Sequence, residues 1–204
     1  MARNYVSNSR DSKRMFKNNL FESLSKVHFS VPLLIFLPVI SFFFWKALYP
    51  GAMPVGKFAV YFVAGIFIWT LTEYLMHRFV FHFTPKGKLM ERLHFIFHGV
   101  HHDYPNDARR LVMPPSVSIP LATGFYFLFS LFLAVFSLAA FFAGFLSGYL
   151  FYDMTHYALH HANFKSAFWK KLKKHHMRHH YSESQKGYGV SSDFWDRIFG
   201  SNFH

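Results

Sequence analysis

Long apolar runs without a charged residue divide this chain of 204 residues. They cover residues 29–45, 58–72 and 111–152. Because a helix needs about 20 residues to cross a bilayer, the third run is long enough for two helices and a tight turn around 135–140. The pattern therefore predicts an all-α integral membrane protein with four transmembrane helices. These are expected at about residues 29–48, 57–76, 115–134 and 137–155.

Polar residues fill the stretches between these runs. We predict a lead-in over residues 1–28 and a membrane domain over 29–204, whose stretches 77–114 and 156–204 form a helical cap. The net charge is +12, and every Lys and Arg except Lys46 and Lys57 lies in the lead-in or in the cap stretches. By the positive-inside rule, the cap and both termini are expected on the cytoplasmic side.

The composition narrows the function classes. Hydrophobic residues make up 52% of the chain and charged residues 16%, which is too apolar for an ordinary soluble domain. The basic residues flank membrane segments and do not favour nucleic-acid binding. Cysteine is absent, which fits a site facing a reducing compartment. No signal-peptide layout is visible, so the first span is expected to remain as an anchor in a bacterial inner membrane or an endoplasmic reticulum membrane.

Histidine clusters are the candidate chemistry, and all of them fall on the predicted cytoplasmic side. Residues three and four apart share a helix face, so His176, His179 and His180 are expected to point at one place. His77 and His82 are five apart, which is about 140° on a regular helix, so either the helix breaks there or the two bind from different sides. The candidate ligands are His77, His82, His98, His101, His102, His156, His160, His176, His179 and His180.

Ten imidazoles are more than one ion can use, because zinc or iron takes roughly four to six ligands. The count therefore predicts a cap that holds two metals. Packed or solvated histidines without a metal are the plain alternative. A membrane metal transporter or store is the alternative of another class, although transport would favour ligands at mid-membrane rather than at one edge.

Three further residues are candidates for supporting the ligands. Glu73 and Asp153 each lie within one turn upstream of a candidate ligand, where a carboxylate either orients an imidazole or is only an interfacial charge. His94 lies four residues before His98 and is either an additional ligand or a packed neighbour. Arg109 and Arg110 either meet an acidic lipid head group or flank a membrane span.

The spacing of the histidines resembles that of a known family. The boxes HxxxxH, HxxHH and HxxHH resemble those of the fatty acid hydroxylase and sterol desaturase superfamily, over roughly residues 70–204. The segments RLVMPP and GYGVSS are similar to those of the fatty acid 2-hydroxylases. This resemblance implies a di-iron membrane oxygenase that uses O₂, with the ten histidines as metal ligands. The implied substrate is the acyl chain of a fatty acid, ceramide or sphingolipid, hydroxylated next to its carbonyl.

Two points follow from that resemblance. Oxygen insertion needs a redox-active metal, so iron is expected to be the working metal even where zinc occupies a preparation. Many relatives carry a fused cytochrome b5 domain and these residues do not, so a separate donor such as cytochrome b5 or ferredoxin is expected. Desaturation, or sterol or carotenoid oxidation, is the alternative outcome on the same scaffold.

Overall fold

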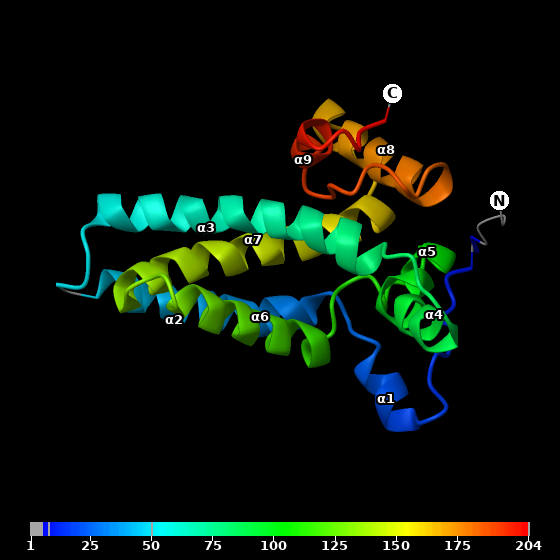
Figure 1. The fold of residues 1–204 in the computed structure, drawn as a ribbon, viewed down its shortest axis with the longest axis horizontal. Helices are drawn as coiled ribbons and strands as arrows, with labels where there is room; N and C mark the ends of the chain where they lie inside the picture. The colour runs from blue at the N-terminus through cyan, green and yellow to red at the C-terminus, as the bar shows by residue number, and fades with distance from the viewer. Residues whose placement is uncertain (1–5, 8, 50, 204) are drawn as a thin grey trace.

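Four long helices lie side by side in the computed structural model of the chain, which describes residues 6–7, 9–49 and 51–203 (Figure 1). Within the described residues the regular secondary structure is entirely helical. The long helices are α2 (Ser30–Leu48), α3 (Val55–Leu75), α6 (Pro115–Ser130) and α7 (Val135–His161). This agrees with the predicted all-α membrane protein at the level of the fold class.

Three helices of the described chain are long and apolar enough to cross a membrane: Ser30–Leu48, Val55–Phe81 and Val135–His161. The predicted span 115–134 is a helix of only 16 residues, about 24 Å long, which is shorter than the roughly 30 Å hydrocarbon core. Four full-length spans are therefore not confirmed.

The turn between α6 and α7 lies at 131–134, so its prediction around 135–140 is wrong. The run 111–152 has no charged residue to mark the turn, and its few serine and threonine residues are spread along it. At the other end, α7 continues past the predicted end at residue 155 and carries its histidines out of the bundle on the same rigid helix.

Close packing between α3 and α7 forms the centre of the bundle. A Cβ atom placed on Gly65 would collide with the carbonyl of Phe141, and one placed on Gly144 would collide with the carbonyl of Phe62. Membrane helices associate through such small residues because apolar side chains gain little by leaving lipid for one another. The two backbones therefore lie in direct contact, which fixes the position of α7 against α3.

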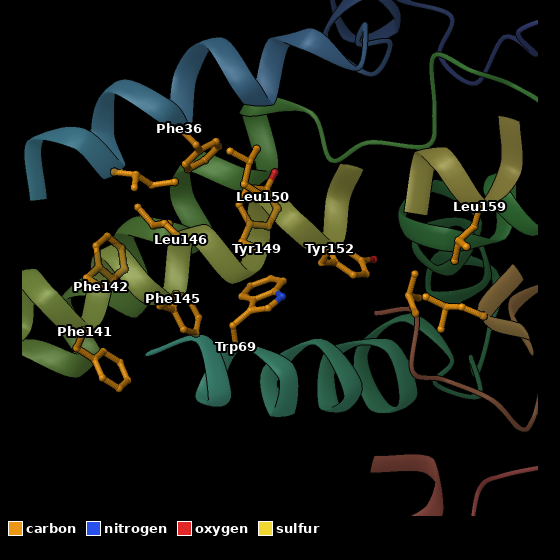
Figure 2. Packing of buried hydrophobic residues seen from close by; sticks show 13 residues of the cluster. Phe36, Trp69, Phe141, Phe142, Phe145, Leu146, Tyr149, Leu150, Tyr152 and Leu159 are labelled. Carbon is orange, nitrogen blue, oxygen red and sulfur yellow. The ribbon is translucent and has the colours of Figure 1, made fainter. Parts of the chain in front are cut away.

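Aromatic side chains of α3 and α7 pack against one another next to this contact. Figure 2 shows the indole of Trp69, from α3, pointing toward Phe145, Tyr149 and Tyr152 of α7. The ring centroids of Trp69 and these three residues lie 5.2–5.8 Å apart, in edge-on or tilted arrangements. This is the separation at which aromatic pairs attract one another.

Short helices gather at the end of the bundle where α7 reaches His161 (Figure 1). The α-helices are α1 (Asn19–Leu24), α4 (Lys88–His94), α5 (Val100–Asp103), α8 (Ala167–Tyr181) and α9 (Phe194–Ile198). Two π-helices, η1 (Met76–Phe81) and η2 (Phe95–Gly99), continue α3 and α4 respectively. The end of α7 and these elements other than α1, which belongs to the lead-in, form the cap, and the cap contains the histidine boxes.

The η1 π-helix explains the five-residue spacing of His77 and His82. The backbone N–H of His82 donates to the carbonyl of His77 at 3.1 Å, which is the i to i+5 bond of a wider turn. This turn stacks the two side chains on one face. Of the two expected alternatives, the regular α-helix does end here, at Leu75, where the π-helix takes over, whereas the expectation that the two histidines bind from different sides is wrong.

Candidate metal centre

Ten histidines of the described chain lie in two compact groups, and the ligand nitrogens within each group are all within 4.8 Å of one another. Group one consists of His77, His82, His98, His102 and His179. Group two consists of His101, His156, His160, His176 and His180. The two sets together are the ten candidate ligands that the sequence indicates.

Each HxxHH box divides between the two groups. His176 and His180 of α8 belong to group two, whereas His179 between them belongs to group one. The expectation that these three point at one place is therefore wrong. His179 is rotated by about 60° and 100° from its two partners around the helix, which aims it at the neighbouring group. The box on η2 and α5 divides in the opposite sense, because its middle member, His101, joins group two.

This exchange places the groups directly beside each other. The rings of His102, in group one, and His180, in group two, are stacked with centroids 4.2 Å apart. Two helices thus each supply ligands to both groups. A shift of α8 as a whole would therefore move ligands of both groups.

The nitrogen spacing within a group fits a shared cation. The Nε2 atom of His98 lies 3.0–3.1 Å from the Nε2 atoms of three other imidazoles. One ring nitrogen has either one proton or one lone pair, so a hydrogen bond accounts for at most one of these contacts. Ligands at right angles around a metal about 2.1 Å away would lie about 3.0 Å apart. The described residues therefore fit two metal ions, each able to bind up to five imidazoles.

Burial keeps these rings neutral, which metal binding requires. Burial, together with the charges that neighbouring imidazoles would carry, lowers the pKa of His98, His101 and His102 well below the ordinary value of 6.5. Burial also lowers the pKa of His179 to about 4, although its bond to the Lys186 carbonyl acts in the opposite direction. Protons therefore do not compete for these nitrogens near neutral pH.

The three supporting candidates lie near the site but outside both groups. Glu73 accepts hydrogen bonds from the backbone of Val190 and Ser191 rather than from an imidazole. Asp153 accepts from the Met113 amide at 3.2 Å. His94 is half-buried near His82 and beside a surface cavity.

Arg110 is buried rather than facing lipid. Its guanidinium bonds Glu22 of α1 at 2.8 Å, and its Nε lies 3.3 Å from the carboxylate of Asp107. It also donates to the Lys13 carbonyl at 2.6 Å. This cluster fastens residues 13–25 to the loop after α5.

Other residues that support the ligands stand at no regular spacing from the histidines. The sequence pattern therefore does not predict them. The carbonyls of Lys186 and Tyr188 accept hydrogen bonds from the Nδ1 atoms of His179 and His77. Asp196 is fully buried beside them. The segment GYGVSS marked this region only by resemblance.

Two adjoining cavities lead from the histidines into the bundle. The larger, about 340 Å³, is lined by His98, His101 and His156 together with residues of α1. The smaller, about 40 Å³, is almost wholly apolar and lies between α3, α6 and α7. Phe81, Met113 and Tyr152 line both cavities.

A third cavity, about 460 Å³, reaches the groups from another side. It is lined by His82, His102 and His180, with polar neighbours such as Asp103 and Gln185. The larger of the two adjoining cavities has a different set of histidines in its wall. The two groups are therefore accessible through two separate openings.

Comparison with known proteins supports the family resemblance that the histidine boxes indicate. The model of the fatty acid hydroxylase family matches residues 62–201. The ceramide very long chain fatty acid hydroxylase of Schizosaccharomyces pombe is 41% identical over 186 residues, which are 90% of this chain and 53% of that protein. A dihydroceramide fatty acyl 2-hydroxylase of Arabidopsis thaliana is 37% identical over 194 residues, covering 95% of this chain and 81% of that protein.

A solved structure is similar as well. The structure described as full-length scs7p with only the hydroxylase domain visible is 41% identical and superposes with a TM-score of 0.87, covering 93% of this chain and 71% of that one. The chain spans about half the length of the yeast relatives that it matches. The resemblance read from the histidine boxes is confirmed: this chain belongs to the fatty acid hydroxylase family.

Proposed function

We propose that this protein is an O₂-dependent lipid hydroxylase that places a hydroxyl group on the acyl carbon next to the carbonyl of a fatty acid, ceramide or sphingolipid. The observation that carries the proposal is the pair of five-histidine groups that opens into a cavity continuing between membrane helices. The names of the relatives, which are ceramide and fatty acyl hydroxylases, support the same substrate class.

The shape of the cavities supports oxidation near the head-group end. Histidines line the larger cavity, whereas the narrow cavity beyond Met113 and Tyr152 is apolar. An acyl tail laid in the narrow cavity would leave its carbonyl end in the larger one. Carbons close to the carbonyl, rather than those in mid-chain, would then lie against His98 and His101.

The ligand sets would hold two iron ions, one in each group, with zinc able to occupy the same nitrogens in a preparation. Bound iron would supply O₂ activation and attack on an unactivated C–H bond. The overall reaction takes substrate, O₂, two electrons and two protons to the hydroxylated lipid and water. The protein's own part is to orient the imidazoles, hold the acyl chain and keep water away from its tail.

The membrane arrangement is also part of the proposal. We place α2, α3 and α7 across the bilayer and α6 beside α7 as a shorter fourth membrane helix. The basic residues at the cap end, set against only Lys46 and Lys57 at the other, support a cytoplasmic cap. The lipid substrate would then enter from the bilayer, near the exposed apolar residues Phe21 and Leu24 that line the larger cavity.

The polar third cavity suits the water-borne reactants. It reaches His82, His102 and His180 without passing the lipid cavity. We assign to this side the exchange of water and protons and the approach of a separate electron donor, such as cytochrome b5 or ferredoxin. The basic charge of the cap favours an acidic donor surface.

Reconstitution tests the function directly. Protein purified without oxygen, loaded with Fe²⁺ and supplied with a reductant and isotopically labelled O₂, should convert a ceramide to a product carrying one labelled oxygen next to the acyl carbonyl. A product lacking two hydrogens would indicate a desaturase instead. Recovery of intact ceramide from protein that holds two iron ions would refute the hydroxylase assignment.

A further inference from the structure

A short backbone segment, residues 186–191, holds two imidazoles of group one; we call it the strap. The strap carbonyl of Lys186 accepts the Nδ1–H of His179 at 2.7 Å. The strap carbonyl of Tyr188 accepts the Nδ1–H of His77 at 2.5 Å. These bonds set the tautomer of both rings and leave each Nε2 facing the group. The two histidines come from α8 and η1, so the strap aligns ligands from different elements.

Asp196 of α9 holds the first half of the strap. Its carboxylate accepts the backbone N–H groups of Tyr188 at 2.9 Å and Gly189 at 2.8 Å. The same carboxylate accepts from Ser201 Oγ at 2.8 Å and contacts His175 Nε2 at 3.1 Å. Asp196 has no exposed surface, so water does not compete for these bonds.

Glu73 of α3 holds the second half. One carboxylate oxygen accepts the backbone N–H groups of Val190 and Ser191, both at 2.8 Å. The other accepts the Ser191 hydroxyl at 2.7 Å. Glu73 is 5% exposed. Two carboxylates from different helices therefore fix four consecutive strap amides.

Group two is supported elsewhere. His156 bonds the carbonyl of Leu111, and His160 bonds that of Pro105. Both carbonyls belong to the loop after α5, which Arg110 fastens to the lead-in. The strap carbonyls at 186 and 188 accept only from members of group one among these described bonds. A disturbance of the strap should therefore affect one group and spare the other.

We propose that Glu73 and Asp196 are positioning residues for the ion of group one, acting through the strap carbonyls on His77 and His179. Neither carboxylate acts as a ligand. This inference rests on the proposed two-metal function and specifies which side chains set the geometry of one of its ions. Loss of such an outer hydrogen bond typically weakens metal binding by about 10–100-fold.

The two carboxylates differ in how many of their hydrogen bonds an amide side chain can keep. In Asp196→Asn, the new NH₂ group faces a strap N–H whichever way the amide is turned, so one strap bond is lost and two donors meet. In Glu73→Gln, the amide oxygen can accept both strap N–H groups while its NH₂ donates to Ser191 Oγ. Glu73→Met keeps the length of the side chain but removes every strong acceptor.

The experiment is a zinc titration of the full chain in detergent, after removal of its metal, in competition with a coloured chelator. Wild type should bind two ions. Asp196→Asn and Glu73→Met should each bind one ion with wild-type affinity and a second about 10–100-fold more weakly. Glu73→Gln should resemble wild type. The retained ion of group two reports that each variant is folded.

The alternatives give different results. Equal weakening of both ions, or wild-type affinity at both with only a lower melting temperature, would mean that the carboxylates serve the fold alone. A wild-type chain that binds no zinc would overturn this inference together with the proposed function. Selective weakening in a chain that does not hydroxylate ceramide would leave the inference standing while the proposed reaction fails.

Discussion

The Nε2 atom of His179 lies 3.0 Å from that of His82, although the two residues are 97 positions apart in the chain. This contact joins the middle histidine of the HxxHH box on α8 to the residue that follows η1, while His176 and His180 of the same box belong to the other group. A single helix therefore clamps both groups, which explains why an HxxHH box needs three histidines rather than a same-face pair.

Because the HxxHH box of α8 is divided between the two groups, we expect a single substitution in it to weaken the binding of one ion only. His179→Ala should weaken the ion of group one by at least about tenfold and leave the ion of group two bound, because only one of the two sets loses a ligand. His180→Ala should do the reverse. Metal analysis of the purified variants, with a spectroscopic probe of each site, would check this. His161→Ala is the control, since His161 is exposed and lies outside both groups.

The narrow apolar cavity predicts control of acyl length. Ala122 lines this cavity, so Ala122→Phe should fill it and shift the products toward shorter acyl chains. Leu128→Phe on the same helix is the matched control, because Leu128 is 46% exposed and does not line the cavity. Mass spectrometry of products from ceramides of mixed chain length provides the measurement. An unchanged product distribution in Ala122→Phe would show that the acyl tail lies elsewhere.

The contact between α3 and α7 predicts a strong position dependence of glycine substitution. Gly144→Ala should destabilise the protein by about 1–3 kcal/mol or more, because the added methyl group meets the Phe62 carbonyl of a rigid helix. Gly124→Ala should change stability by no more than about 1 kcal/mol, since nothing lies within 4 Å of its Cβ position. Thermal unfolding in detergent compares the two. Similar melting temperatures would contradict the close packing.

The ion pair between Glu22 and Arg110 predicts loosening of the lead-in at low pH. Burial alone would raise the pKa of Glu22, but its bonds to Lys26 and to the Phe16 and Met15 amides, with the charge of Arg110, lower it from 4.5 to about 2. A lowered folded-state pKa gives stabilisation that is complete above 4.5 and is lost as the pH falls toward 2.

Hydrogen exchange at the two amides of residues 15 and 16, which donate to Glu22, follows this change. After correction for the intrinsic exchange rate, their protection should fall between about pH 4.5 and 2. Glu22→Gln should reduce protection at neutral pH and remove this pH dependence. Protection that stays constant in wild type down to pH 2 would show that the ion pair does not hold the segment.

The sequence by itself determined that the protein is a helical membrane protein, which ten histidines are the candidate ligands, and to which family the chain belongs. Apolar runs must be buried in lipid or in the bundle, and imidazoles at helical spacing must fall on neighbouring faces, so both signals are local and periodic. Because these signals are local, the sequence did not predict every turn and helix end. The run 111–152 has no charged residue to mark its turn, and its serine and threonine residues are spread along it, so nothing in it shows that α6 stops at Ser130.

Only the tertiary structure decided how the histidines divide. The assignment of His101 and His179 depends on which side chains lie opposite them, and those come from helices far apart in the chain. The π-helix that aligns His77 with His82 and the strap held by Glu73 and Asp196 are likewise set by long-range contacts. Spacing along a chain fixes the direction of a side chain relative to its own helix, whereas a metal site requires convergence of several helices, which only packing provides.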